Sequence, residues 1–244
     1  MQIDHLRSHI VNWIKKEVVY SKTKGVVLGL SGGLDSSVVA FLAKEALGKD
    51  RVLALILSCH SQNQDMVDAK LVIRLLGIKR KLIDLSKTYD YLLQILPKAD
   101  RLTQANLKTR LRMSILYYFA NKLNYLVCGT SNKSELMVGY FTKYGDGAAD
   151  ILPIGDLLKT QVRQLAVALG VPKRIIVKPP TAGLWPGQTD EEEMGIVYSE
   201  LDDILERIQK KRRQIISEVK VNQVKAMIER SEHKREVPKI CKVN

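Results

Sequence analysis

The chain reads Gly29-Leu30-Ser31-Gly32-Gly33-Leu34-Asp35-Ser36-Ser37 between an apolar run and a segment of helical period, and this stretch is the strongest indication of the fold. Adjacent glycines allow the backbone to adopt positive φ and to approach a bulky anion closely. The amides and the positive dipole end of the following helix favour phosphate. The alternative is a plain strand-to-helix turn in which Ser31 or Asp35 caps the helix. Two glycines, one Asp and three serines in one turn favour a phosphate-binding loop.

Asp35 indicates which chemistry this loop serves. The stretch has neither the Lys of the GxxxxGK[ST] loop nor the spacing of GxGxxG, so it matches neither of those nucleotide-binding motifs. A carboxylate beside phosphates is repulsive unless a cation lies between them. The sequence therefore predicts that Asp35 holds Mg²⁺ against the phosphates of a nucleotide.

Strands and helices alternate on both sides of the loop. We expect strands over residues 24–30, 51–57, 81–85 and 125–129, and helices over 3–20, 35–47, 65–76 and 103–123. This order predicts an α/β fold, with a mainly parallel twisted sheet flanked by helices and a ligand site at the carboxyl ends of the strands. We expect residues 1–244 to form a single domain, with a helical C-terminal part from about 190 to 244.

The net charge of +13 first suggests a nucleic acid or another polyanion as the ligand. Residues 207–244 hold 12 basic and 4 acidic side chains, whereas residues 190–206 hold eight acidic side chains and no basic one. The basic excess is therefore largely a property of the tail. The tail has an apolar period through Ile215, Val219, Val224 and Ile228, which predicts helices docked on the protein. An aromatic content of 6% leaves little for stacking on bases.

The composition, 45% hydrophobic and 27% charged, excludes a disordered or collagen-like chain. No apolar run approaches the roughly 18 to 20 residues that span a bilayer. The N-terminal residues do not form an export signal. The three cysteines include no close pair, which is typical of a reducing compartment. We therefore expect a cytoplasmic protein.

Beyond the glycine loop, several segments resemble one enzyme family. The run Ser31–Ser36 resembles the pyrophosphate loop of ATP pyrophosphatases, which cleave ATP between its α and β phosphates to adenylate a substrate. The remaining segments occur in the order and near-spacing of ammonia-dependent NAD synthetases, and the chain is identified as a member of that family over nearly its whole length. These segments are Asn106–Met113, Gly129–Glu135, Gly139–Gly147, Asp150–Pro153, Lys159, Pro180–Glu191 and Glu232–Arg235.

The resemblance implies a reaction in two steps. In that family ATP adenylates the pyridine carboxylate of nicotinic acid adenine dinucleotide (deamido-NAD), and ammonia then displaces AMP to give NAD. The implied partners are therefore deamido-NAD, ATP and ammonia, with Mg²⁺ as the cofactor. The family is usually homodimeric, with the dinucleotide site near the subunit interface. No membrane or nucleic acid is expected as a partner.

The resemblance also implies roles for individual residues. Asp35 and Glu135 are expected to bind Mg²⁺, while Asp35, Lys159 and Asp150 are expected to be catalytic. Asp150 is the candidate that accepts a proton from ammonia. The expected ATP contacts are Gly29, Leu30, Ser31, Gly32, Gly33, Leu34, Asp35, Ser36, Thr130, Lys159 and Thr181. The expected deamido-NAD contacts are Arg110, Lys143, Asp150, His233 and Lys234.

Several of these residues also have a simpler interpretation. Glu135 follows Asn132 by three residues, which is the spacing of a capping box. Arg110 is by default a solvated helix residue, and the His233-Lys234 pair is by default part of a basic tail. Cys128 is expected in the core.

Two positions depart from the family pattern, and two segments are candidate lids. Ala105 and Thr109 stand where the family commonly has Gly and Ala, which affects the local turn and packing. The stretches 139–147 and 183–187, rich in Gly and aromatic residues, could cover a mixed anhydride against hydrolysis.

Two other functions remain open on sequence alone. The first is another AMP-forming ATP pyrophosphatase, such as a tRNA-modifying thiolase or a lysidine-type ligase. Thiolases generally need a reactive cysteine pair, which the dispersed Cys59, Cys128 and Cys241 do not supply. The second is a nucleic-acid-binding module that uses the basic tail. A glutamine-cleaving activity would need a further domain, so we expect the nitrogen source to be free ammonia or ammonia delivered by a separate protein.

Overall fold

A parallel four-stranded sheet lies at the centre of the computed structural model, which describes residues 2–185, 187–210 and 217–243. Within these residues the strand order is β3-β2-β1-β4. The strands are β1 (Gly25–Gly29), β2 (Val52–Ser58), β3 (Lys79–Asp84) and β4 (Tyr125–Val127). Every pairing is parallel, and Val26 lies opposite both Val52 and Leu126. The α/β fold expected from the sequence is therefore confirmed.

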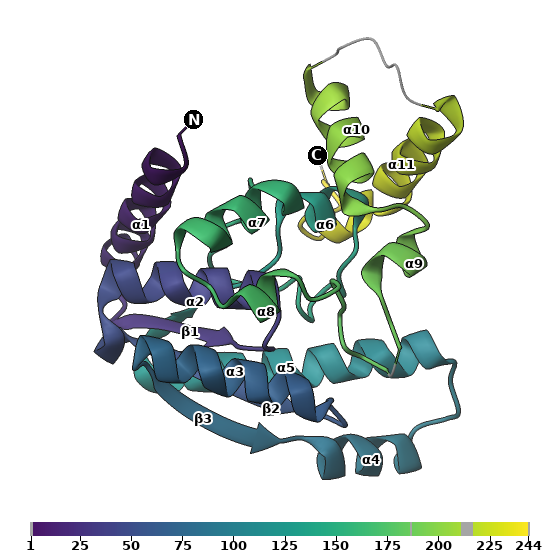
Figure 1. The fold of residues 1–244 in the computed structure, drawn as a ribbon. Helices are drawn as coiled ribbons and strands as arrows, with labels where there is room; N and C mark the ends of the chain where they lie inside the picture. Colours follow the sequence, from purple (N-terminus) through teal and green to yellow (C-terminus); the bar gives the residue numbers. More distant parts are fainter. Residues whose placement is uncertain (1, 186, 211–216, 244) are drawn as a thin grey trace.

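Helices cover both faces of this sheet (Figure 1), with α2 and α3 in front of it and α5 behind it. A short 3-10 helix, Lys49–Arg51, leads into β2. The helices are α1 (Ile3–Tyr20), α2 (Leu34–Leu47), α3 (Asn63–Leu76), α4 (Ser86–Ile95), α5 (Arg101–Leu123), α6 (Lys133–Val138), α7 (Lys159–Ala168), α8 (Lys173–Ile176), α9 (Asp190–Met194), α10 (Tyr198–Lys210), α11 (Glu218–Arg230) and α12 (Glu232–Arg235).

The alternation of side chains along β1 divides the core into two layers. Val26 and Leu28 pack into one cluster with residues of α1, α2, α3 and α7. Val27 points to the other face, where it packs with residues of α4 and α5. All three side chains are completely buried, and burial of each contributes roughly 1.5 to 3 kcal/mol. A strand buried on both faces reads as a continuous apolar run, which explains the run before the glycine loop.

β3 is one of the two edge strands, and it differs from the other strands because most of its side chains are exposed. The sequence predicts a strand over 81–85, but the strand begins at Lys79, where the backbone pairs with Leu53. Lys79, Arg80 and Lys81 are all exposed, so no apolar alternation marks the start of the strand. Charged side chains on an edge oppose pairing with the sheet of another chain.

Helices α10 and α11 lie side by side (Figure 1), which confirms the helical C-terminal part, and their buried side chains belong to a third apolar cluster. Tyr198 and Leu201 of α10 pack there with Val221 and Val224 of α11. The prediction that Ile215, Val219, Val224 and Ile228 form one apolar face is only partly confirmed. Val224 is buried, but Val219 is 76% exposed, because Val221 faces the cluster instead. Ile215 lies outside the described residues.

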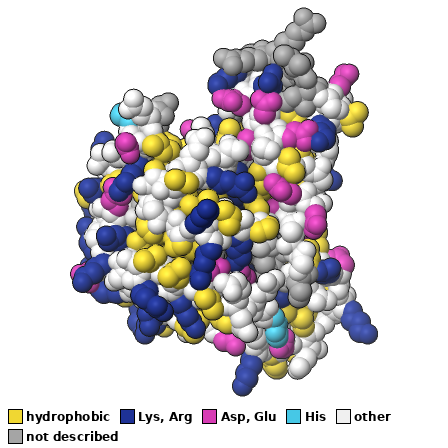
Figure 2. Space-filling view, viewed as in Figure 1, with side chains coloured by type: hydrophobic (Ala, Val, Ile, Leu, Met, Phe, Trp, Pro, Cys, Tyr) yellow, Lys and Arg dark blue, Asp and Glu magenta, His cyan; other side chains and the backbone are white. Residues whose placement is uncertain are grey.

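Charge is divided between regions of the molecule. On the face drawn in Figure 2, Lys and Arg are prominent at the lower left, near α3 and β3, while Asp and Glu are frequent at the upper right, near α9 and α10. The acidic α10 and the basic α11 are joined by an ion pair between Glu200 and Lys220. Part of the basic tail therefore neutralises the acidic segment that precedes it.

The positions that depart from the family pattern are both buried in α5. Ala105 is 3% exposed and Thr109 is 7% exposed. A Cβ built on Gly145 would lie only 2.3 Å from Thr109 Oγ1. Thr109 therefore packs directly against the backbone of the 139–147 stretch. The side chain of Thr109, which is larger than the Ala common in the family, fits because the residue opposite, Gly145, has no side chain.

Two further expectations from the sequence concern the state of the cysteines and the absence of membrane-spanning segments. Cys128 is 1% exposed, which confirms it as a core residue, and Cys59, Cys128 and Cys241 form no disulfide. Burial raises the pKa of both the Cys59 and the Cys128 thiols. In the part of the chain that the structure describes, no helix is both long enough and apolar enough to cross a membrane.

Candidate active site

The loop after β1 leaves the first turn of α2 open to a ligand. Gly33 is the N-cap residue of α2, and no side chain caps this helix. Ser31 and Ser36 are instead 3.1 Å apart, Oγ to Oγ, and Ser37 Oγ donates to the carbonyl oxygen of Gly33 at 2.7 Å. Uncapped amides at a helix N-terminus form a site for an anion, because the helix dipole adds to their donors.

Gly32 explains why the loop requires glycine. Its φ is +83°, a conformation that L side chains rarely adopt. A Cβ at this position would also lie 2.2 Å from the carbonyl oxygen of Asp65 in α3. The loop is therefore pressed against the first turn of α3, which fixes its shape.

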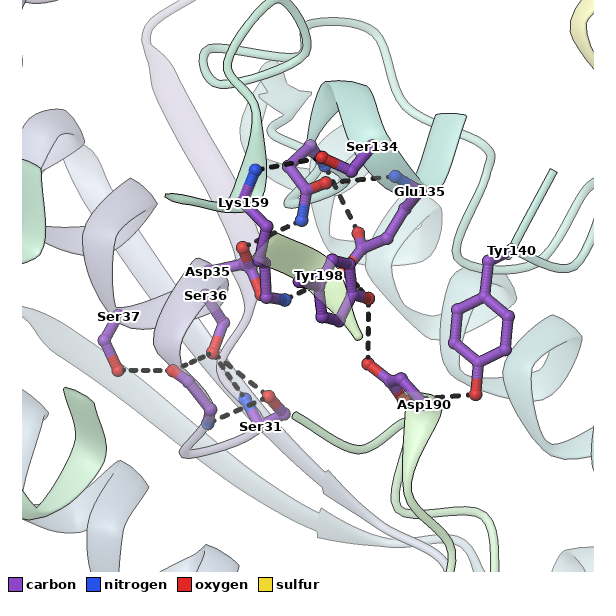
Figure 3. A network of polar contacts seen from close by, with 12 residues as sticks. Ser31, Asp35, Ser36, Ser37, Ser134, Glu135, Tyr140, Lys159, Asp190 and Tyr198 are labelled. Atoms are coloured by element: carbon purple, nitrogen blue, oxygen red, sulfur yellow. Dashed lines mark hydrogen bonds and ion pairs between the residues drawn. The ribbon is translucent and has the colours of Figure 1, made fainter. Parts of the chain in front are cut away.

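One lysine joins the two carboxylates that the sequence predicts as metal ligands (Figure 3). Lys159 Nζ lies 2.6 Å from Asp35 Oδ2 and 3.0 Å from Glu135 Oε1. Asp35 belongs to α2, Glu135 to α6 and Lys159 to α7, so three helices meet at this point. The Lys159 side chain is only 3% exposed. The structure thus brings together three predicted residues that are separated by as many as 124 positions.

Asn132 places Glu135 in this cluster. Its side chain accepts from the amide of Glu135 at 3.0 Å, while the carboxylate of Glu135 accepts from the amide of Asn132, which forms a capping box at the start of α6. Asn132 Nδ2 also donates to Asp35 Oδ1 at 3.1 Å. The capping role of Glu135 is therefore confirmed, and the same carboxylate also faces Lys159.

Burial dominates the ionisation of this cluster. It raises the pKa of Glu135, and Asp35 adds to this rise while Lys159 opposes it. Burial by itself lowers the pKa of Lys159, but the carboxylates of Asp35 and Glu135 more than offset this effect. The pKa of Lys159 is therefore raised, and its ammonium group remains charged across the physiological range.

A second polar group adjoins the cluster and was not anticipated as a site (Figure 3). Asp190, only 4% exposed, accepts from the hydroxyls of Tyr140 and Tyr198, each at 3.1 Å. Tyr198 also donates to Glu135 Oε1 at 3.3 Å. Burial raises the pKa of Asp190 above its ordinary value. The only sequence signal was that Asp190 lies near the end of the family-like run Pro180–Glu191, at the start of an acidic segment.

A cavity of about 590 Å³ opens over the loop. Its volume is in the range of small-molecule sites. It is lined by most of the predicted ATP contacts, although Gly32 is not part of its lining. The predicted residues in the lining are Gly29, Leu30, Ser31, Gly33, Leu34, Asp35, Ser36, Thr130, Glu135, Lys159, Thr181 and Lys234.

The predicted dinucleotide contacts divide into groups. Arg110 Nε donates to the carbonyl oxygen of Lys143 at 3.3 Å, and Lys143 Nζ donates to the carbonyl oxygen of His233. These three residues therefore form one connected group, but none of them lines the cavity. Lys234 lines it, yet its ammonium donates to the carbonyl oxygens of Gly139 at 2.8 Å and Phe141 at 3.0 Å.

Asp150 lies apart from the loop and from the cavity lining. Its Oδ2 accepts from the amide of Val127 in β4 at 2.7 Å, and its Oδ1 accepts from the Tyr117 hydroxyl at 3.2 Å. Its neighbours in this chain therefore support the end of β4, and the structure does not bring Asp150 to the Lys159 cluster.

Both candidate lid segments contribute to the cavity wall. Phe141 and Thr142 represent the first. Leu184 and Trp185 represent the second, where Lys108 Nζ donates to the carbonyl oxygen of Leu184 at 2.9 Å. The Arg101 guanidinium lies 4.2 Å from the centre of the Trp185 ring. Pro186, also in the second stretch, lies outside the described residues.

Comparisons with known proteins extend the similarity far beyond the loop. A family model described as NAD synthase matches residues 6–238. An NH3-dependent NAD(+) synthetase of Archaeoglobus fulgidus is 51% identical over 245 residues, which cover 100% of this chain and 98% of that protein. An NMN synthetase structure from Francisella tularensis has a TM-score of 0.92 and 39% identity, with 100% of both chains covered. The structure of an NH3-dependent NAD synthetase from Campylobacter jejuni has a TM-score of 0.87 and 30% identity, with 99% of this chain and 100% of that chain covered.

Proposed function

The chain belongs to the NAD synthase family, and from this membership we propose that it converts deamido-NAD to NAD with ammonia and ATP, releasing AMP and pyrophosphate. One observation carries the proposal: Asp35, Lys159 and Glu135 meet beside the uncapped first turn of α2. The family match spans residues 6–238. It therefore favours this function over the two others considered from the sequence, a tRNA-modifying enzyme and a nucleic-acid-binding module.

The proposed reaction begins with attack of a pyridine carboxylate oxygen on the α phosphorus of ATP. Negative charge then develops on the transferring group and on the departing pyrophosphate, so fixed cations and oriented amides are the main source of catalysis. The amides of the loop and the ammonium of Lys159 are placed to supply them. We assign Thr130 and Thr181 to ATP as well, because both line the same cavity.

Asp35 and Glu135 fit a role as Mg²⁺ ligands. Both carboxylates already converge on one cation, the ammonium of Lys159. Among the described residues, no three His, Cys, Asp or Glu side chains gather as a metal cage. Mg²⁺ is usually held by one or two carboxylates together with substrate phosphates and water. A bound Mg²⁺ would neutralise phosphate charge, while Lys159 would turn from the carboxylates toward the phosphates.

For deamido-NAD we propose contacts with Arg110, Lys143, His233 and Lys234, as the family pattern implies. The hydrogen bonds that connect the first three place them in one group, next to the 139–147 stretch. Because this group lies outside the cavity lining, the dinucleotide would extend from the cavity toward α5 and α12.

We propose that Asp150 joins this site through a second copy of the chain. We propose a homodimer in which α5 contributes to the interface. This helix carries partly exposed apolar side chains such as Leu111, Ile115 and Tyr118 beside Tyr117, the partner of Asp150. Light scattering tests the proposal: a monomeric mass at micromolar concentration would contradict it.

Asp190 is better placed than Asp150 to accept a proton from ammonia. It is a buried carboxylate in the cavity wall, and its raised pKa brings it closer to the range in which a general base works well. We therefore propose Asp190 for this role and retain Asp150 only as a substrate contact across an interface.

A second acceptor follows from one comparison. The Francisella tularensis structure is described as an NMN synthetase. Amidation of nicotinate mononucleotide gives NMN by the same chemistry, so the mononucleotide is the alternative substrate. The curated relative with 51% identity is an NAD(+) synthetase, which favours the dinucleotide.

A direct assay tests the proposed function. Purified protein with ATP, Mg²⁺ and ammonium is offered deamido-NAD or nicotinate mononucleotide in parallel. We expect a higher kcat/KM for deamido-NAD, with AMP and pyrophosphate as the other products. A higher kcat/KM for nicotinate mononucleotide would identify the mononucleotide as the acceptor. Release of ADP and phosphate would refute the adenylation step.

A further inference from the structure

Arg163 lies one helical turn beyond Lys159 on α7 and lines the same cavity. Residues four apart lie on the same face of a helix, so both side chains point to the same side of α7. This helix packs against α2, the helix that carries Asp35. Arg163 and the phosphate loop therefore line the same cavity, although neither the loop motif nor the family-like segments include Arg163.

The guanidinium of Arg163 has an unused donor. Its Nε is buried and makes no hydrogen bond to any described residue. No ion pair joins Arg163 to an acidic residue in the described ranges either. Two other arginines near the cavity differ: Arg112 donates to the carbonyl oxygen of Leu57 at 3.0 Å, and Arg174 pairs with Asp68 at 2.6 Å. A buried donor without an acceptor costs free energy, so it calls for an explanation such as a missing ligand.

The neighbouring charges indicate what that ligand is. Lys159 is already bound to two carboxylates, and Lys178, which also lines the cavity, is bound to Asp65 and Asp68. Arg163 has no acidic partner among the described residues. Arg230 lines the cavity without one as well, but only Arg163 has a buried side-chain nitrogen without a hydrogen-bond partner in the described ranges. A guanidinium presents a planar set of donors that matches phosphate oxygens, often through two hydrogen bonds at once.

We propose that Arg163 binds the β and γ phosphates of ATP and holds them as they leave. In the proposed reaction the acceptor carboxylate forms a bond to the α phosphorus, while the bond from that phosphorus to the bridging oxygen of the β phosphate breaks. The electron pair stays on pyrophosphate, which therefore gains negative charge. This inference rests on the proposed AMP-forming function and adds to it a residue for the leaving group.

Binding of inorganic pyrophosphate to the unliganded protein tests the contact directly. Calorimetry in the presence of Mg²⁺ should show that Arg163→Met weakens pyrophosphate binding by about tenfold to a hundredfold, which is the usual range for loss of a hydrogen bond to a charged group. Binding of AMP should change less than about twofold. Arg7→Met is the matched control, because Arg7 pairs with Glu45 on the surface of α1, and it should change neither affinity.

Thermal unfolding of the unliganded variants separates a binding role from a structural one. Because Arg163 has no partner to lose, Arg163→Met should melt at the same temperature as the natural protein or higher. Arg163→Lys, which keeps the charge but not the planar donors, should bind pyrophosphate with intermediate affinity.

Three results would overturn the inference: unchanged pyrophosphate affinity in Arg163→Met, an equal loss for AMP and pyrophosphate, or a collapse of the fold in either variant. The proposed function fails separately. If the natural protein binds pyrophosphate but amidates no nicotinate acceptor, the role of Arg163 stands and the assigned reaction does not.

Discussion

Two lysines in the cavity wall each bridge a pair of carboxylates, yet their surroundings differ. Lys159 joins Asp35 and Glu135 and is 3% exposed, whereas Lys178 joins Asp65 and Asp68 and is 22% exposed. The first cluster unites α2, α6 and α7 at the phosphate loop, while the second ties the segment after α8 to α3. The same local chemistry therefore serves two purposes: concentrated charge for the reaction, and attachment of a covering segment.

The largest expected effect comes from the carboxylate that the phosphate loop supplies. Asp35→Ala should lower turnover by about a thousandfold or more, because it removes a proposed Mg²⁺ ligand and a partner of Lys159. NAD formation by the purified variant measures this loss. Circular dichroism should show an unchanged fold, since Lys159 keeps Glu135 as a partner. Near-normal turnover at ordinary Mg²⁺ would remove Asp35 from the metal site.

Removing the buried lysine should cost stability as well as activity. Lys159→Met leaves Asp35 and Glu135 close together without a cation, and breaking a buried ion pair in this way costs about 3–5 kcal/mol. Urea unfolding near neutral pH measures the free energy of unfolding. A loss no larger than that of the exposed-pair variant Lys133→Met would show that the cluster contributes little to the fold.

The ionisation of Glu135 should appear in the pH dependence of stability. Burial raises its pKa from 4.5 to about 7, so the folded protein holds a proton that the unfolded chain releases. Stability should therefore fall as pH rises through this window, by about 3 kcal/mol. Glu135→Gln should flatten the fall, as measured by urea unfolding at successive pH values. The surface variant Glu45→Gln should retain it, and identical slopes in both variants would contradict the assignment.

The more exposed lysine should have the smallest effect. Lys178→Met should lower the free energy of unfolding by only about 1 kcal/mol, because Asp68 keeps Arg174 as a partner and Asp65 gains access to water. Its consequence should instead be a KM for ATP raised about fivefold, with kcat less affected, since the segment that covers the cavity is less firmly held. Steady-state kinetics measure both values. A fall in kcat as large as that of Lys159→Met would show that the two lysine clusters do not differ in their contribution to turnover.

Most elements around the sheet could be predicted because they carry a local signal, although the predicted helices did not include α4 and α7. The helix over Ile3–Tyr20 agrees with its predicted range, and the buried strands were found within two residues of their ends. The start of β3 was missed because its exposed edge has no apolar pattern. The short helices α6, α8 and α9 gave no periodic signal, since each spans less than two full turns.

For the site residues, too, success depended on whether the signal lies in one continuous stretch or comes from distant parts of the sequence. The phosphate loop is one continuous stretch, so its glycines and Asp35 could be identified from composition and order. Lys159 and Glu135 came only from the family resemblance, because no spacing shows that they meet Asp35. Asp190 and Arg163 were missed, since one depends on tyrosines as far as 50 positions away and the other on the absence of a partner.

The contact between Thr109 and Gly145 constrains how this protein can change. A Cβ at position 145 would lie 2.3 Å from Thr109 Oγ1, so any side chain there collides while Thr109 is present. Shortening Thr109 to Ala would remove the closest of these atoms, although the Cβ atoms of Thr109 and Thr142 would still lie 3.0 Å from the added Cβ. The two positions are therefore coupled, and the order in which mutations arise decides whether the intermediate protein keeps its 139–147 stretch in place. A side chain at position 145 would therefore be more crowded in this protein than in a relative with Ala at position 109.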